Sequence, residues 1–202
     1  MCKDNYIEKC TAIFTSYGVK VSADEISRML QISKRTLYEQ FESKENLIFE
    51  CVNHTINKIQ TLKEAHFSDN KNNVIEKLFP FTNPQLQKML LEENRFLKDV
   101  RRLHVDIYRK TLEIHIESFK NNIIGIIKEG IDEGVFIPDI NPEIIIDVIF
   151  MIHDALTNKL EFFDKFPPLE IFKNTALCYL RGISTQKGLE MIAQTLKFEK
   201  NN

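Results

Sequence analysis

The side chains best suited to bind a phosphate or to read a nucleic-acid base lie close together near the N-terminus. Lys34 and Arg35 stand side by side, and both can reach guanine acceptors or phosphate oxygens. Thr36 can contact a phosphate or a thymine methyl group. Ser43 and Lys44 stand at the start of a predicted helix, where backbone amides and a lysine suit a phosphate. This segment is therefore a candidate for nucleic-acid contact.

Two short helices joined by a tight turn must position these side chains. Ser22 and Glu25 form a capping-box pattern at the start of the first helix, and the second begins after Ser33. Between Leu30 and Lys34 there are only three residues, so the helices cross at a steep angle. With a helix predicted over residues 5–17, this is the pattern of a helix-turn-helix, whose second element enters the major groove. The residues expected to face inward are Ile7, Cys10, Phe14, Tyr17, Ile26, Met29, Leu30, Ile32 and Leu37.

The charge of the chain excludes DNA binding by bulk electrostatic attraction. The 202 residues carry a net charge of -2, and the first 48 hold seven Lys or Arg and seven Asp or Glu. Such a chain has no global basic field. Any DNA contact must come from cations at particular positions.

In this segment the sequence resembles the TetR family of bacterial regulators. The resemblance implies that the second helix faces DNA. Two residues depart from the family pattern: Arg35 stands where glycine is frequent, and Gln40 where histidine is frequent. The matching residues are Phe14, Gly18, Ile26, Ile32-Ser33-Lys34-Arg35-Thr36-Leu37-Tyr38, Phe41, Ser43-Lys44-Glu45 and Leu47. The resemblance implies that Ser22, Lys34, Arg35, Thr36, Tyr38 and Lys44 face DNA, and Ser33 completes the set of predicted DNA-binding residues.

The same residues have plainer explanations. Tyr38 can be a core aromatic residue, and Lys44 a solvated lysine at a helix start. A three-helix unit can also bind another protein in place of DNA. The complete ordered pattern favours DNA binding over these alternatives.

The rest of the chain also predicts helices. Glycine and proline are scarce, with six of each, and no segment shows sustained alternation of apolar and polar residues. The predicted fold class is all-α, with an N-terminal three-helix helix-turn-helix unit at residues 1–46 and a larger helical ligand-binding and dimerisation domain at 47–202. Beyond the first three, the main predicted helices span residues 44–62, 84–97, 102–133, 141–163, 168–184 and 185–198.

The helix predicted to begin at Asn141 is apolar on nearly every side between Ile144 and Ile152. Such a helix must be covered all round, either inside a monomer or by a second subunit. The family resemblance implies a dimer, in which helices 142–163 and 168–184 pack against their twins. A two-fold dimer presents two reading helices to a pseudo-palindromic site. The candidate interface residues are Ile145, Ile149, Ile152, Leu156, Leu177 and Leu180.

A mixed stripe on the long predicted helix is the candidate lining of a ligand pocket. His104, Tyr108, Thr111 and His115 follow one side of that helix. With 15 Phe in the chain, a pocket here suits a small apolar or amphipathic effector. The alternative is a stripe that is partly exposed or packs on a neighbouring helix. The two histidines lie about 16 Å apart along the axis and cannot share a metal.

Motifs of catalysis, export and membrane insertion are missing from the sequence. It has no GxSxG, HExxH, P-loop or GxGxxG string, no signal peptide and no span long enough for a bilayer. The expected compartment is the cytoplasm. No metal or cofactor is predicted, because the four cysteines (Cys2, Cys10, Cys51 and Cys178) show no metal-binding spacing and are expected as free thiols.

These features predict a ligand-responsive transcriptional regulator, acting as a repressor, that binds a double-stranded DNA operator as a homodimer. It is not expected to be an enzyme. Two alternatives stay open: a helical protein-interaction scaffold, and an enzyme whose site is assembled from distant residues.

Overall fold

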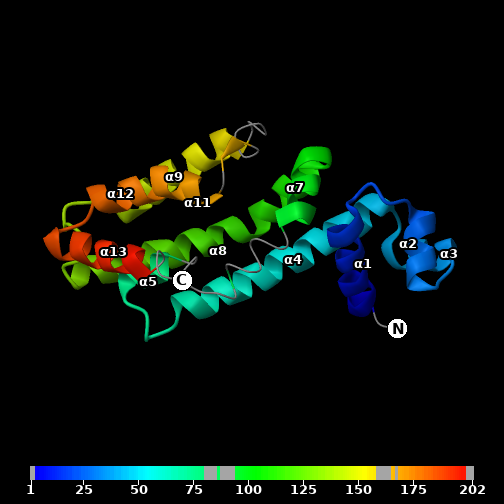
Figure 1. Ribbon diagram of the computed structural model, residues 1–202, viewed down its shortest axis with the longest axis horizontal. Coiled ribbons are helices and arrows are strands. Elements are labelled where there is room, and N and C mark those ends of the chain that lie inside the picture. Colours follow the sequence, from blue (N-terminus) through cyan, green and yellow to red (C-terminus); the bar gives the residue numbers. More distant parts are fainter. Residues whose placement is uncertain (1–2, 80–85, 87–93, 158–164, 167, 199–202) are drawn as a thin grey trace. The chain divides into compact units, whose positions relative to one another are not determined.

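The computed structural model describes residues 3–79, 86, 94–157, 165–166 and 168–198, and Figure 1 shows them as helices joined by turns. The predicted all-α class is confirmed. Among the described residues, the only β-type pairing is an isolated antiparallel bridge between Phe136 and Ser184. The helices are α1 (Lys3–Tyr17), α2 (Ala23–Leu30), α3 (Lys34–Phe41), α4 (Lys44–Phe67), α5 (Val74–Leu78), α7 (Asn94–Leu103), α8 (Val105–Asp132), α9 (Pro142–Thr157), α11 (Pro168–Asn174), α12 (Ala176–Gly182) and α13 (Gln186–Phe198).

The chain divides into two compact units. The first comprises Met1–Lys63 and Pro84–Glu117, and the second comprises Glu64–Asn83 and Ser118–Asn202. Each unit has its own buried apolar cluster. Helices α4 and α8 contribute residues to both units.

The core of the first unit is built from α1 to α4 together with α7. Ile7, Cys10 and Phe14 are buried on one face of α1, and the ring of Phe14 stacks on Phe96 of α7 with centroids 5.6 Å apart. The expectation for Tyr17 is wrong, because this side chain is 64% exposed. At about 100° per residue, Tyr17 lies roughly 60° round the helix from Phe14, which takes it off the buried face.

Helix α2 buries Ile26 and Leu30, which lie about one turn apart. Met29 was also expected to face inward, but it is 44% exposed. It lies about 100° round the helix from Leu30, so both cannot face the same narrow core.

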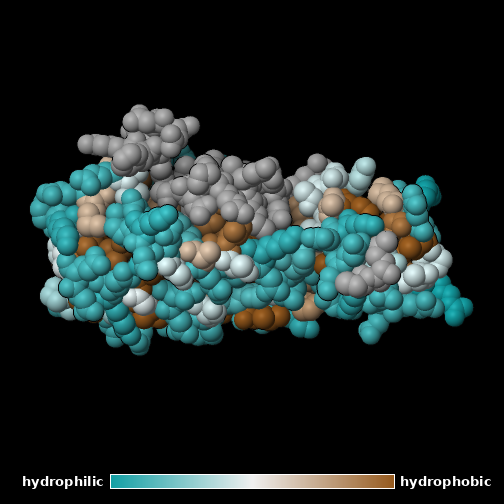
Figure 2. Space-filling model, turned by 90° about the horizontal axis from the view of Figure 1, so that it is seen from below, coloured by the Kyte–Doolittle hydropathy of each residue, from teal (hydrophilic) through white to brown (hydrophobic). Residues whose placement is uncertain are grey.

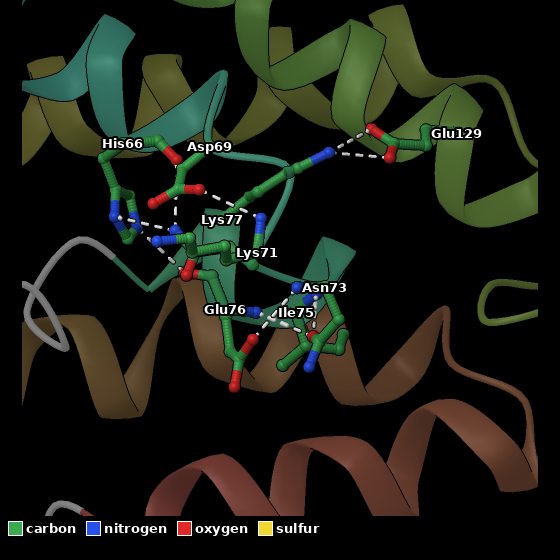
Figure 3. Close-up of polar contacts among 9 residues, drawn as sticks. His66, Asp69, Lys71, Asn73, Ile75, Glu76, Lys77 and Glu129 are labelled. Carbon is green, nitrogen blue, oxygen red and sulfur yellow. Dashed lines mark hydrogen bonds and ion pairs between the residues drawn. The ribbon is translucent and has the colours of Figure 1, made fainter.

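The core of the second unit combines α5, the C-terminal part of α8, α9, α12 and α13. An ion pair ties α5 to α8: Nζ of Lys77 donates to both carboxylate oxygens of Glu129, at 2.7 and 2.9 Å (Figure 3). At the end of α4, Nε2 of the buried His66 lies 2.9 Å from the carbonyl oxygen of Glu76, and Nδ1 lies 3.3 Å from the amide nitrogen of Asn72. These contacts fix the turn between α4 and α5.

Two predicted helices are interrupted in the structure. The helix expected over 102–133 is divided at His104, between α7 and α8, whereas Gly125 and Gly130 lie within α8 without breaking it. The helix expected over 168–184 is divided at Thr175, whose backbone has φ -123° and ψ -90°. Its hydroxyl donates to the carbonyl of Ile171 at 2.7 Å, a competing bond that helix periodicity does not reveal.

Other boundaries differ less. Helix α4 continues to Phe67, beyond the expected end, and α7 begins at Asn94, while most of the helix expected over 84–97 lies outside the described residues. The predicted cap of the last helix is present, since the hydroxyl of Thr185 accepts from the N–H of Gly188 at 3.3 Å. Within the described part of the chain, no helix is long and apolar enough to cross a membrane.

Candidate nucleic-acid interface

The turn between α2 and α3 is short because Gln31 adopts a left-handed backbone conformation, with φ 56°. Its N–H donates to the carbonyl of Arg28 at 3.1 Å, and the N–H of Ile32 donates to Ser27 at 3.0 Å. Helix α2 therefore ends abruptly and α3 begins three residues later. Leu30 and Leu37, from the two helices, lie in the same buried cluster.

Serine hydroxyls cap both helices, and the predicted capping box at Ser22 is present. The Ser22 hydroxyl accepts from the N–H of Glu25 at 3.2 Å, and the Glu25 carboxylate accepts from the N–H of Ser22 at 2.8 Å. The Ser22 hydroxyl also donates to the Glu25 carboxylate at 2.7 Å, and this bond, together with the one from the Ser22 N–H, holds the pKa of Glu25 below its ordinary value. At the start of α3, the Ser33 hydroxyl accepts from the N–H of Thr36 at 2.9 Å, and the two hydroxyls lie 2.8 Å apart. The start of each helix is thereby fixed.

The exposed face of α3 carries the predicted cations, and each is paired with a carboxylate. Nζ of Lys34 lies 2.9 Å from Oδ2 of Asp24 on α2, and Nε of Arg35 lies 2.9 Å from Oε1 of Glu39. The hydrogen bond to Asp24 raises the pKa of Lys34. Both cations remain available to a stronger anionic partner, since their side chains are 49% and 88% exposed.

Tyr38 is half-buried and packs against the core of the first unit. Part of its surface therefore serves the fold, as the plainer explanation proposed. Tyr38 also lies one turn after Lys34 on α3, the helix that carries both Lys34 and Arg35.

The turn between α3 and α4 is held by two residues that the sequence pattern did not single out. Glu42 has φ 62°, and its N–H donates to the carbonyl of Tyr38 at 2.8 Å. The side-chain amide of Asn46 donates to the carbonyl of Phe41 at 3.0 Å, and its backbone N–H donates to the Ser43 hydroxyl at 3.0 Å. No sequence signal marks Glu42, because a left-handed glutamate is uncommon.

Lys44 begins α4 and is a half-buried cation. Burial lowers its pKa, and Glu45 and Glu25 only partly oppose that effect. Among the described residues, none forms an ion pair with Lys44. A phosphate bound at the N-terminus of α4 would offset the loss of water around this ammonium group.

The arrangement defines a class of protein: a capped three-helix unit with exposed cations on its third helix is a helix-turn-helix of the DNA-binding type. Residues 8–51 match the family model described as "Bacterial regulatory proteins, tetR family". The predicted resemblance is therefore confirmed. The chain carries the DNA-binding helix-turn-helix domain of TetR-family transcriptional regulators and, over its described residues, their fold.

Solved structures with the same fold cover most of the chain. A TetR-family transcriptional regulator from Marinobacter aquaeolei VT8 is 15% identical, with a TM-score of 0.66 and coverage of 98% of each chain. Regulatory protein TetR from Rhodobacter sphaeroides is 17% identical, with a TM-score of 0.62 and coverage of 85% of this chain and 94% of that one. The fatty acid degradation regulator FadR from Bacillus halodurans is 16% identical, with a TM-score of 0.58 and coverage of 84% and 89%. No curated protein matches the chain. The matched family and structures are regulators, a class that is generally not enzymatic.

The predicted effector stripe lies in the first unit. Tyr108 packs against the core, and burial raises its pKa. Thr111 is fully buried, and its hydroxyl donates to the carbonyl of Ile107 at 2.9 Å. Nε2 of His115 lies 3.2 Å from the side-chain oxygen of Asn53 on α4. His104 is half-buried at the break before α8. The stripe thus faces the unit's interior, at least from Tyr108 to His115.

The predicted dimer residues occupy different places. Leu177 and Leu180 are 2% and 7% exposed in the core of the second unit, so they offer little surface to a partner. Ile145 and Ile149 are half-buried against the same core. Ile152 is half-buried as well, and the side chain of Leu156 lies outside the described part of the structure.

Two other apolar side chains of α9 are open to solvent. Ile144 and Met151 are each 62% exposed. They lie two turns apart on one side of the helix, with Val148 and Ala155 on the same side. On the face that Figure 2 draws, apolar patches interrupt a mostly hydrophilic surface. The helix is thus apolar on its buried side and also on its exposed side.

Proposed function

We propose that this protein is a cytoplasmic transcriptional repressor that binds a pseudo-palindromic operator as a homodimer and releases it when a small apolar or amphipathic effector binds. The observation that carries the proposal is the first turn of α3, where Lys34, Arg35 and Thr36 follow a capped start on a three-helix unit with a buried apolar core. A polar, cationic helix face supported in this way is what major-groove reading requires.

Each predicted DNA contact has a proposed role. Lys34 and Arg35 exchange their carboxylate partners for guanine acceptors or phosphates, and Thr36 contacts a phosphate or a thymine methyl group. The exposed part of Tyr38 contacts the DNA backbone, and Lys44 binds a phosphate at the start of α4. The hydroxyls of Ser22 and Ser33 cap the N-termini of α2 and α3. These caps hold the two helix ends in place, so that backbone amides face phosphates.

The proposed dimer interface is centred on the exposed side of α9. Ile144, Val148 and Met151 form its apolar stripe, in place of Leu177 and Leu180, which are buried in the protomer. The predicted contacts Ile152 and Leu156 belong to the same helix. A two-fold axis through this stripe joins identical surfaces from two copies, as in an isologous dimer.

The proposed effector site is formed by His104, Tyr108, Thr111 and His115. The observation that supports this site is the mixture of aromatic and polar groups in the interior of a helical unit, where a ligand is removed from water.

Selection of bound duplexes from a random DNA pool tests the DNA-binding proposal. The recovered sites should be inverted repeats with half-sites one helical turn apart, about 34–36 Å. Lys34→Ala should then bind the selected site roughly 5- to 150-fold more weakly, with a salt slope reduced by about 1. Lys58→Ala is the matched control, because Lys58 is 47% exposed in the same unit and also pairs with one carboxylate, Glu8.

Equal affinities of the Lys34 and Lys58 variants for the selected site would remove α3 from the groove. Repression is tested separately by transcription in vitro from a promoter that overlaps the selected site, where added protein should lower transcript yield. An increase in yield would identify an activator. A metabolite library screened for weaker operator binding tests the effector proposal, and the active compounds should lose their effect in Tyr108→Ala.

A further inference from the structure

Carboxylates already occupy the two cations proposed to bind DNA. Asp24 lies 2.9 Å from the ammonium group of Lys34, and Glu39 lies 2.9 Å from the guanidinium group of Arg35. All four side chains are exposed, by between 49% and 88%. A DNA phosphate or base acceptor therefore meets a carboxylate beside each cation, and it must either replace that carboxylate or share the cation with it.

Asp24 is the more consequential of the two acids because of its position. Glu39 is one helical turn from Arg35 on the same helix. Asp24 instead belongs to the first turn of α2, two residues after the Ser22 cap, and it reaches across to α3. Since the N-terminus of α2 is a proposed phosphate contact, the carboxylate stands on the side of the unit that faces DNA. There it competes for Lys34 and also repels phosphates directly.

Resting on the proposed function, we infer that Asp24, assisted by Glu39, lowers the affinity of the helix-turn-helix for DNA of arbitrary sequence and so raises its selectivity for the operator. Non-specific binding depends almost entirely on cations that meet phosphates. The ion pair between Asp24 and Lys34 therefore weakens non-specific binding most. The operator also provides base contacts, which offset the broken ion pairs. Asp24 is in this sense a specificity-determining residue.

The size of the effect follows from the exposure of the pair. Exposed ion pairs are weak and are screened by salt, so displacing Asp24 alone costs DNA about 1.5- to 5-fold in affinity. Repulsion between the carboxylate and nearby phosphates adds to this. Asp24→Asn should thus bind a scrambled duplex about 3- to 10-fold more tightly than the parent at low salt, and the gain should shrink as salt is raised.

Fluorescence anisotropy with the full chain measures this, using one labelled duplex of scrambled sequence and one carrying the selected operator. Asp139→Asn is the control, because Asp139 is an exposed aspartate of the second unit and the variant has the same change in net charge. Asp24→Asn should raise affinity for the scrambled duplex more than for the operator, whereas Asp139→Asn should leave both within about twofold. In a Lys34→Ala background, the gain from Asp24→Asn should become smaller, because the competition for Lys34 is gone.

The inference is overturned if Asp24→Asn matches Asp139→Asn on the scrambled duplex, or if it raises affinity for both duplexes equally. In either case the parent still binds its operator, and the proposed function stands. If neither the parent nor Asp24→Asn binds any duplex, the proposed function fails and this inference fails with it. Thermal unfolding of each variant, expected to match the parent because Asp24 is exposed, separates these outcomes from misfolding.

Discussion

The proposed dimer can be tested by placing a charge on the exposed stripe of α9. Ile144 is 62% exposed in the protomer, so Ile144→Glu should not disturb the fold of a single chain. In the proposed dimer, the same side chain is buried twice, once from each copy. A carboxylate at this position must lose water without gaining a partner, which is unfavourable.

The magnitude follows from the exposed fraction. Full burial of an isoleucine side chain contributes about 1.5–3 kcal/mol. Since 62% of Ile144 is exposed, its remaining burial in a dimer contributes about 1–2 kcal/mol for each copy, or roughly 2–4 kcal/mol for both. At 1.4 kcal/mol for each tenfold change, the dimer Kd should rise about 30- to 700-fold. Desolvation of the two carboxylates raises it further.

Sedimentation velocity over a concentration series measures the dimer Kd, and circular dichroism checks that helicity is kept. Ile114→Glu is the matched control, since Ile114 is an isoleucine of α8 that is 57% exposed in the first unit. It should leave the dimer intact. A parent that is monomeric at micromolar concentration would refute the proposed dimer, and equal effects of the two variants would refute the assignment of the interface to α9.

Three further predictions concern stability and reactivity. Glu129→Gln should lower the free energy of unfolding by about 1–2 kcal/mol, because it leaves the buried ammonium of Lys77 without its charged partner. The effect is limited because Glu129 is 42% exposed and solvent screens it. An unchanged urea midpoint would contradict this prediction. Iodoacetamide should label the exposed Cys178 in the native chain but not Cys10, because Cys10 is buried and burial raises its pKa to about 12; peptide mass spectrometry after brief labelling distinguishes them. Burial lowers the pKa of His54, so the unfolded chain takes up a proton before the folded chain as pH falls through the ordinary value of about 6.5. The free energy of unfolding of the parent should therefore decrease below that pH, and it should decrease less in His54→Gln. Urea unfolding at two pH values measures both.

Features that depend on neighbouring residues could be predicted from the sequence. The capping box of Ser22 and Glu25, the cap at Ser33 and the short turn after Leu30 all involve groups within four residues of each other. Their hydrogen bonds are decided locally, so the pattern of residue types is sufficient. The helix-turn-helix could be predicted for the same reason.

Features that depend on tertiary packing could not be predicted in this way. The apolar run of α9 showed that the helix must be covered, but periodicity does not say which side faces the chain's own core. The structure turns Ile145 and Ile149 toward that core and leaves Ile144 and Met151 in solvent. Likewise, Asp24 is ten residues away from Lys34 in sequence, and only the crossing of α2 and α3 brings them together.

Within the first unit, contacts between α4 and α8 provide a route by which the proposed effector would change DNA affinity. Asn53 on α4 is hydrogen-bonded to His115 of the proposed effector stripe at 3.2 Å, and Nζ of Lys110 on α8 lies 5.0 Å from the ring centroid of Phe49 on α4. Lys44, the proposed phosphate contact, is nine residues before Asn53 on the same helix, about 14 Å along its axis. An effector that binds His115 in place of Asn53 would therefore act on the helix whose first residue is a proposed DNA contact. Such a ligand needs to prefer the released arrangement of α4 by only about 1–3 kcal/mol to weaken operator binding 5- to 150-fold.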